Sequence, residues 1–291
     1  MKLRRRRILI VGASSGLGRE LAIQLARRDC SLVLFSRSIE KLHLDADFVK
    51  YAGSCSRLVA GNACDSQDIE RLAEVICNDE NTSDTQTADV NSPGTVKSCN
   101  GTLDGIIVMA GVSRPDFIEN PDIDRAIDTL RTNLEAPMRI LYRFMPMLIG
   151  REGTFVAACT SMAGDRGVPR AHAYSASKAG LDRFLESLRI DLFDRGVKVF
   201  TIVPGYVETP MSGQNRFPMP GMWPVGRAAE YVIRAMERET PIIRFPWYHS
   251  FSMRLLGLLP DFLYLRLMNA QRPLVRIVPR EGDRFSWPSD C

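Results

Sequence analysis

Short runs of consecutive apolar residues alternate along the chain with longer stretches in which apolar residues recur every three or four positions. The runs suit strands buried on both faces of a sheet, and they lie at 8–11, 32–35, 57–60, 105–109, 153–158, 198–203 and 242–245. The periodic stretches predict amphipathic helices at 16–28, 67–78, 122–148, 173–194 and 228–239. This alternation predicts an α/β fold, a doubly wound parallel sheet of about seven strands with helices on both faces.

Two segments depart from this alternation. Residues 78–102 are rich in Asn, Asp, Ser and Thr, and we expect them to form an exposed, mobile insertion. Residues 246–291 are rich in leucine and aromatic residues, interrupted by Arg254, Asp261 and Arg266. The sequence therefore predicts one large domain over residues 1–245, followed by a C-terminal extension over residues 246–291.

Composition excludes several classes of protein. The chain has 291 residues, 45% of them hydrophobic, and a net charge of +4, so we expect neither wholesale disorder nor nucleic-acid binding. His43, His172 and His249 are the only histidines and lie far apart in the sequence, so we expect no metal site. The cysteines are odd in number and none are spaced as C-x-x-C, which predicts reduced thiols in a cytoplasmic protein; they are Cys30, Cys55, Cys64, Cys77, Cys99, Cys159 and Cys291.

Arginines occupy all four positions from Arg4 to Arg7, directly before the first predicted strand. The apolar run that follows is only four residues long and leads straight into Gly12, so it is a buried strand and not a signal peptide. We interpret the arginines as a solvated approach to that strand. A role in targeting, or in contact with an anionic membrane, is the alternative.

A glycine-rich turn follows the first strand, with Gly12, Gly16 and Gly18 opening the first helix. Glycine allows a backbone to approach a ligand closely, and the helix N-terminus offers free N–H groups and the positive end of its dipole. A glycine-rich turn in this place predicts a site for the pyrophosphate of a dinucleotide.

The spacing G-x-x-x-G-x-G resembles that of the short-chain dehydrogenase/reductase family, over roughly residues 7–245. The resemblance implies a Rossmann fold that binds a nicotinamide dinucleotide. It places cofactor contacts in this turn at Gly12, Ser14, Ser15, Gly16, Leu17 and Gly18.

The end of the second strand indicates which nicotinamide dinucleotide is bound. Ser36 stands where an acidic residue would accept hydrogen bonds from the adenosine ribose, and Arg37 follows it. A guanidinium can bind a phosphate with two hydrogen bonds, so the pair predicts NADP(H) rather than NAD(H). The alternative is that Arg37 is an ordinary surface residue. Asp65 matches the position at which the family contacts the adenine ring.

Acid–base chemistry is predicted for Tyr174 and Lys178, which lie four positions apart and so share one face of a helix. We expect the ammonium to lower the pKa of the phenol. In the resemblance, Tyr174 exchanges the proton, Lys178 binds the nicotinamide ribose and Ser161 hydrogen-bonds the substrate carbonyl. Asn133 matches the family asparagine that holds a water relaying protons to the lysine.

Two further turns complete the resemblance. Ala110 and Gly111 match the turn against the cofactor ribose, although Val108 and Met109 replace the two asparagines that usually precede it. We expect these two residues to substitute packing for the lost hydrogen bonds. The turn after the sixth strand matches residues that flank the nicotinamide and contact its carboxamide, namely Pro204, Gly205, Val207 and Thr209.

These residues together predict an NADP(H)-dependent oxidoreductase that interconverts a ketone or aldehyde and an alcohol. Methionines and aromatic residues in 211–223, where the family has its substrate lid, favour an apolar or lipid-like substrate. The alternatives are an epimerase or dehydratase that uses bound nicotinamide, and a dinucleotide sensor without catalytic activity.

Association with other molecules is predicted at two places. The resemblance implies a homo-oligomer, since dimers and tetramers are common in the family. The C-terminal extension is interpreted as an amphipathic cover over the core or a subunit contact. The alternative is an interfacial element that lies on a membrane, which would associate a cytoplasmic protein with that membrane.

Overall fold

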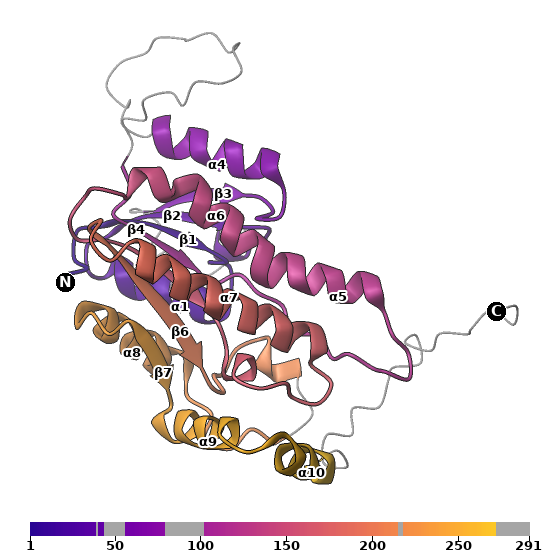
Figure 1. Cartoon of the computed structure of the whole chain (residues 1–291). Coiled ribbons are helices and arrows are strands. Elements are labelled where there is room, and N and C mark those ends of the chain that lie inside the picture. Colours follow the sequence, from indigo (N-terminus) through magenta and orange to yellow (C-terminus); the bar gives the residue numbers. More distant parts are fainter. Residues whose placement is uncertain (39, 44–55, 79–101, 215–217, 272–291) are drawn as a thin grey trace, which may run out of the picture.

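The computed structural model describes residues 1–38, 40–43, 56–78, 102–214 and 218–271. They form a sheet of seven parallel strands in the order β3-β2-β1-β4-β5-β6-β7 (Figure 1), which confirms the predicted α/β fold. Every strand begins and ends within one residue of its predicted bounds. The strands are β1 (Arg7–Val11), β2 (Ser31–Ser36), β3 (Ser56–Ala60), β4 (Gly105–Val108), β5 (Thr154–Cys159), β6 (Val197–Pro204) and β7 (Ile242–Phe245).

Helices cover both faces of the sheet because the central strands β1, β4 and β5 are buried and apolar on both sides. In β1, Ile8 and Ile10 pack toward α1 (Gly16–Ala26) and α8 (Val225–Glu237). Leu9 and Val11 belong to a second apolar cluster on the opposite face. The helices of that cluster are α4 (Ser66–Asn78), α6 (Ala136–Phe144) and α7 (His172–Asp191).

The helix predicted at 122–148 is divided in the structure. It begins as α5 (Ile123–Leu130), where the side chain of Asp122 accepts a hydrogen bond from the N–H of Arg125 at 2.9 Å. A π-helical turn, η2 (Arg131–Glu135), separates α5 from α6, and a 3-10 turn, η3 (Met145–Met147), follows α6. Because a π turn is wider than an α turn, such turns are often found at functional sites. This one contains Asn133, which is fully buried.

The order in which strands are added to the sheet reverses between the parallel strands β1 and β4. Strands β1 to β3 run toward one edge of the sheet and β4 to β7 toward the other. The connections that follow β1 and β4 therefore diverge and leave a crevice at the carboxyl ends of these strands, which is where ligands bind in doubly wound sheets.

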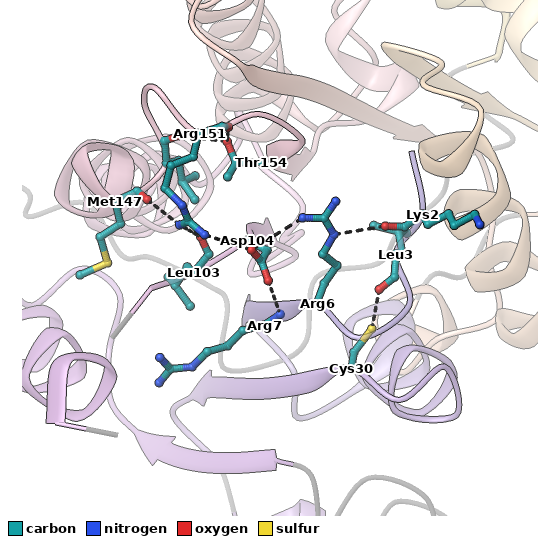
Figure 2. A network of polar contacts seen from close by, with 11 residues as sticks. Lys2, Leu3, Arg6, Arg7, Cys30, Leu103, Asp104, Met147, Arg151 and Thr154 are labelled. Atoms are coloured by element: carbon teal, nitrogen blue, oxygen red, sulfur yellow. Dashed lines mark hydrogen bonds and ion pairs between the residues drawn. The ribbon is translucent and has the colours of Figure 1, made fainter. Parts of the chain in front are cut away.

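The amino ends of the same strands are closed by a polar network around Asp104 (Figure 2). Its carboxylate accepts a hydrogen bond from the N–H of Arg7 at 2.8 Å and pairs with Arg151 at 3.2 Å and Arg6 at 3.7 Å. Arg151 also donates to the carbonyl oxygens of Leu103 and Met147, at 2.7 and 3.0 Å. The Arg7 guanidinium donates to the carbonyl oxygens of Ile76 and Thr102, at 3.1 and 3.4 Å. The interpretation of the N-terminal arginines as a solvated approach is therefore wrong for Arg6 and Arg7, whose side chains bind other segments of the chain.

Cysteines and remaining elements differ partly from the predictions. Cys30, Cys64 and Cys159 are free thiols, as expected, but Cys77 is disulfide-bonded and the prediction is wrong for it.

The insertion predicted at 78–102 lies outside the described residues apart from its two ends. Elements that were not predicted individually are α2 (Glu40–His43), η4 (Met162–Gly164), η5 (Ser212–Gln214), α9 (Trp247–Gly257) and α10 (Asp261–Gln271). Among the described helices, none is both long and apolar enough to cross a membrane.

Candidate active site

The glycine-rich turn is packed so closely that two of its glycines exclude any larger residue. Gly12 has a φ of +84°, and a Cβ there would lie 2.5 Å from the backbone nitrogen of Ala110. A Cβ on Gly18 would lie 2.3 Å from the carbonyl oxygen of Gly12. Ser15 precedes α1, and its side chain makes no capping hydrogen bond. The first N–H groups of the helix are therefore not occupied by Ser15 and lie beside the crevice.

The remaining residues of the turn contribute in different ways. The side chain of Leu17 is buried, so only its backbone belongs to the turn. Gly16 has a φ of +53°, and a Cβ there would lie 3.2 Å from Cγ2 of Thr209. The turns after β1 and β6 therefore meet across the crevice, and the cofactor contacts of Gly16 and Thr209 stay a prediction.

Ser36 and Arg37 lie at the carboxyl end of β2, beside this turn. The Ser36 hydroxyl donates a hydrogen bond to Oγ of Ser14 at 2.7 Å, which ties the end of β2 to the turn. Arg37 is exposed. Asp65 follows β3, and its carboxylate accepts a hydrogen bond from the N–H of Gln67 at 2.8 Å, so it caps α4. Its contact with adenine stays a prediction.

Asn133 is held by three hydrogen bonds to the strand connection after β4 and to α7. Its Oδ1 accepts from the N–H of Val112 at 2.8 Å, and its Nδ2 donates to the carbonyl oxygen of Val112 at 2.8 Å. Nδ2 also donates to Oγ of Ser177 at 3.1 Å. A Cβ on Gly111 would lie 3.3 Å from Oδ1 of Asn133 and 3.4 Å from Nζ of Lys178. The structure therefore brings Gly111, Asn133 and Lys178 to one place.

Ser161 and Tyr174 come from different elements and meet beside this place. Ser161 begins η4, directly after β5, and its Oγ accepts a hydrogen bond from the N–H of Ala163 at 3.2 Å. Tyr174 lies in the first turn of α7, whose Ala173 N–H is held by Asp116 at 2.9 Å. A side-chain hydrogen bond to Ser161 lowers the pKa of Tyr174, but burial outweighs it and raises that pKa to about 12.

Lys178 does not lower the pKa of Tyr174 in this structure, and that prediction is wrong. Its ammonium donates to the carbonyl oxygen of Cys159 at 2.8 Å and lies 5.9 Å from the centroid of the Tyr174 ring. Lys178 is 3% exposed, and burial lowers its own pKa. Desolvation disfavours the charged form of both groups, so it dominates the charge interaction expected from their spacing.

The turn after β6 folds back on itself. The N–H of Gly205, which follows Pro204, donates to the carbonyl oxygen of Phe245 at 2.7 Å. Val207 pairs with Trp223 in an isolated parallel bridge, and Trp223 is buried and stacked on Phe245 at 5.6 Å. Trp223 is therefore a core residue, which corrects its interpretation as part of a substrate lid.

A cavity of about 670 Å³ lies beside the Ser161–Tyr174 pair and not over it. Its wall begins at Ala163 and Gly164, directly after Ser161, and includes Ile118, Val168, Leu265 and Met268. Among the described residues of segment 211–223, none lines it. The apolar surface next to the predicted chemistry therefore comes from η4, α7 and α10, and not from the segment that the sequence suggested.

Sequence reasoning missed two residues that hold the predicted site together. Ser177 accepts from Asn133 and donates to the carbonyl oxygen of Tyr174 at 2.7 Å, so it links η2 to α7. Cys159 supplies the carbonyl oxygen that binds Lys178. A backbone carbonyl has no signature in sequence, whereas Ser177, directly before Lys178, could have been noticed as a polar residue on a buried helix face.

Val108 and Met109 replace the missing asparagines by packing, as expected. Val108 is buried, and Met109 packs against the apolar cluster on the α1 face. The N–H groups of Met109 and Ala110 both donate to the carbonyl oxygen of Val11, at 2.8 and 3.1 Å. Backbone hydrogen bonds therefore tie this turn to β1.

The chain is similar to known proteins in both sequence and fold. A family model described as short chain dehydrogenase matches residues 6–218. An uncharacterized oxidoreductase from Myxococcus xanthus (strain DK1622) is 30% identical over 260 residues, which cover 89% of this chain and 94% of that protein.

Two solved structures share the fold. A short chain dehydrogenase from Burkholderia cenocepacia J2315 in complex with NADP has a TM-score of 0.74 at 22% identity, covering 92% of this chain and 99% of that one. A short chain dehydrogenase/reductase from Burkholderia phymatum in complex with NAD has a TM-score of 0.73 at 18% identity, covering 91% and 96%. At these identities the likeness concerns the fold alone.

Proposed function

The chain belongs to the short chain dehydrogenase family of oxidoreductases, and we propose that it uses NADP(H) to interconvert a ketone or aldehyde and the corresponding alcohol. The observation that carries this proposal is the meeting of Ser161, Tyr174 and Lys178 at the carboxyl end of the sheet, beside the glycine-rich turn. Proton transfer and cofactor binding are the two capacities that such a reaction requires of the chain.

The residues after β1 fit a dinucleotide. Side chains at Gly12 and Gly18 would overlap backbone atoms, so this turn presents bare backbone to the crevice. Ser14 and Ser15 lie between them, and α1 begins there with its dipole directed at the same point. When bound, the nicotinamide would supply the hydride for reduction or accept it during oxidation.

Tyr174 serves as the proton donor during reduction. Burial raises its pKa to about 12, so at neutral pH the free protein holds it as a phenol that can give its proton to a carbonyl oxygen. The Ser161 hydroxyl, already hydrogen-bonded to Tyr174, is placed to polarise the same oxygen. Lys178 is buried next to them and presents a positive charge with little competition from water.

The preference for NADP(H) rests on Ser36 and Arg37. Ser36 is fixed against the glycine-rich turn by its bond to Ser14, and among the described residues no carboxylate pairs with the exposed Arg37. We propose that its guanidinium binds the 2′-phosphate that distinguishes NADP(H) from NAD(H). A shared fold does not decide the choice, since one structural neighbour binds NADP and the other NAD.

Replacement of Tyr174 by phenylalanine tests the reaction. We expect Tyr174→Phe to lower kcat for carbonyl reduction by about 10²–10⁴-fold, the usual contribution of a general acid, with the dissociation constant for NADPH unchanged. Tyr231→Phe is the matched control, since Tyr231 is exposed on α8. Retained activity in Tyr174→Phe would overturn the assignment, and turnover without consumption of NADPH would favour the epimerase or dehydratase alternative.

Replacement of Arg37 by alanine tests the cofactor. We expect Arg37→Ala to raise the dissociation constant for NADPH by about 10- to 100-fold, because charge-assisted hydrogen bonds to the phosphate are lost, and to leave that for NADH unchanged. Arg4→Ala removes an equally exposed charge at the amino ends of the strands and should affect neither. Equal effects of Arg37→Ala on both cofactors would contradict the phosphate contact.

The substrate is proposed to be apolar or lipid-like. The cavity beside Ser161 has apolar wall residues on α10 and on the segment before α7, and its volume suits a medium-sized apolar group. A series of ketones with increasing alkyl length tests this point. We expect kcat/KM for NADPH-dependent reduction to rise with chain length, and a preference for short polar ketones would contradict it.

A further inference from the structure

We propose that α9 and α10 dock the protein on the surface of an anionic lipid bilayer, an interaction that goes beyond the proposed reaction and does not depend on it. The two helices lie at one end of the molecule, beyond β7 and α8 (Figure 1). Of the nineteen large hydrophobic residues that are exposed in the described chain, nine lie in residues 247–271. These nine form the docking surface: Trp247, Tyr248, Phe251, Leu255, Leu258, Phe262, Leu263, Leu265 and Leu267.

The most exposed apolar residues of α9 form one continuous stripe, to which Tyr248 does not belong. Trp247, Phe251, Leu255 and Leu258 are spaced four, four and three residues apart, which places them on the same face of the helix. They are between 55% and 81% exposed. Trp247 opens the helix, and amphipathic aromatic rings of this kind favour the boundary between lipid and water.

The exposed residues of α10 cover more than one face. Phe262, Leu263, Leu265 and Leu267 span about 200° of the helix circumference at 3.6 residues per turn. Among the described side chains of α10, only Tyr264 is buried. A flat protein partner covers one face of a helix, whereas lipid surrounds an interfacial helix on every side that does not face its own protein. The distribution on α10 therefore favours a lipid surface over a second copy of this chain.

The charges in these helices complement an anionic surface. Arg254 and Arg266 are exposed, and among the described residues neither has a carboxylate partner. Asp261 is the only acidic residue in 247–271, and Arg166 pairs with it at 2.9 Å. Long arginine side chains can lie along apolar surface while their guanidinium groups reach the lipid phosphates.

The docking surface is held against the domain and is not a detached arm. The guanidinium of Arg166 stacks on the ring of Tyr264 at 4.2 Å, and the Tyr264 hydroxyl donates to the carbonyl oxygen of Gly167 at 2.7 Å. Arg244 pairs with Asp165 and donates to Oγ of Ser250 at 2.9 Å, which fixes α9. The two helices are thus held to the domain through Ser250, Asp261 and Tyr264, while nine large apolar residues of this segment stay exposed.

The docking surface is also continuous with the cavity beside the predicted active site. Leu265 is 59% exposed and at the same time lines that cavity. Contact with a bilayer would therefore place the opening of the cavity near the acyl region. An apolar molecule could then reach the cavity without crossing water.

Cosedimentation of the full-length protein with lipid vesicles tests the proposal. We expect the wild-type protein to sediment with vesicles of phosphatidylcholine and phosphatidylserine in equal parts, and far less with phosphatidylcholine alone. A triple variant, Phe251→Ser, Leu255→Ser and Leu258→Ser, should lower the vesicle partition coefficient by at least about tenfold, since three large apolar groups are lost. The control is Ile190→Ser with Phe193→Ser, which changes two residues of comparable exposure at the C-terminal end of α7 and should change nothing.

The charge contribution is tested separately. Arg254→Gln and Arg266→Gln should each weaken partitioning to the anionic vesicles by about fivefold, since one basic residue near such a surface contributes about 1 kcal/mol. Arg4→Gln is the control. Circular dichroism should show all variants folded, because the altered side chains are exposed.

Three outcomes would overturn the proposal. The first is a wild-type protein that does not sediment with anionic vesicles, and the second is a triple variant that sediments as well as the wild type. The third combines two results: the wild-type protein is an oligomer that does not bind vesicles, and light scattering shows that the triple variant is a monomer. This face would then join two copies of the chain. None of these results depends on NADPH consumption, so failure here is distinguishable from failure of the proposed reaction.

Discussion

The two ends of the sheet are built from the same strands but by opposite principles. At the amino ends, Asp104 pairs with the guanidinium groups of Arg6 and Arg151 and accepts a hydrogen bond from the backbone N–H of Arg7, so its charge is fully partnered. At the carboxyl ends, Gly12 and Gly18 present bare backbone. Burial raises the pKa of Tyr174 and lowers the pKa of Lys178, and both shifts favour the neutral form of the side chain. The first arrangement stabilises the fold, and the second leaves groups under electrostatic strain that a substrate and cofactor could relieve.

The comparison predicts that variants at the two ends affect different measurements. The largest effect is expected for Ser161→Ala, which removes the hydroxyl beside Tyr174. We expect kcat for carbonyl reduction to fall by about 10²–10³-fold, as for the loss of a donor to a developing oxyanion. The midpoint of thermal unfolding should change little, because Ser161 takes part only in a long hydrogen bond from the N–H of Ala163 at 3.2 Å and in the hydrogen bond with Tyr174, and neither belongs to the network at the amino ends. A loss of stability as large as that expected for Asp104→Ala would contradict the distinction between the two ends.

Asp104→Ala should show the reverse pattern. Three donors lose their acceptor, so we expect the free energy of unfolding to fall by about 2–3 kcal/mol, measured by urea denaturation. Asp104→Asn can still accept from the N–H of Arg7 and should lose less. The kcat of either variant should equal that of the wild type, and a large fall in kcat would show that the two ends are coupled.

Titration of Tyr174 sharpens the comparison at the carboxyl end. In the free protein, the phenolate absorbance of the wild type minus that of Tyr174→Phe should appear near pH 12, because burial raises the pKa to about 12 from an ordinary value of 10. Since the folded protein holds this proton more tightly, Tyr174 stabilises it fully below pH 10, and that contribution is lost as pH rises toward 12. A transition below pH 10 would restore the prediction that Lys178 lowers this pKa.

The smallest effect is expected at an ion pair outside the network. Arg4 and Asp29 pair at 2.8 Å, with side chains 67% and 55% exposed. Solvent screens such a pair, so Arg4→Ala should change the free energy of unfolding by less than about 1 kcal/mol in urea denaturation. A loss as large as that of Asp104→Ala would mean that the stability of this end does not depend on burial.

Much of the site could be predicted because its residues lie close together in sequence or follow a strand. Gly12 to Gly18 form one local turn, and Tyr174 and Lys178 share a helix face, so short-range geometry is enough to place them. The pKa of Tyr174 could not be predicted in this way, because it depends on how much protein surrounds the ring. The π turn at Asn133 was missed for the same reason, since it is adapted to the backbone of Val112 in another segment.

The C-terminal extension shows the same division. Its leucines and arginines were visible in the sequence, but a leucine-rich helix reads alike whether its apolar residues pack on a core or face outward. Tertiary contacts decided the matter: Arg166 and Arg244 hold α10 and α9 by polar bonds, and nine large apolar residues of this segment stay exposed.

The sequence by itself determined the α/β fold and the strand bounds, because these follow from periodicity over a few residues. It also supplied the candidate site residues, through local spacing and the resemblance to the short-chain dehydrogenase/reductase family. Only the tertiary structure decided the protonation of Tyr174, the partner of Lys178, the place of the cavity and the exposed face of α9 and α10. These properties depend on desolvation and on which segments meet in space, and neither is a function of neighbouring residues alone.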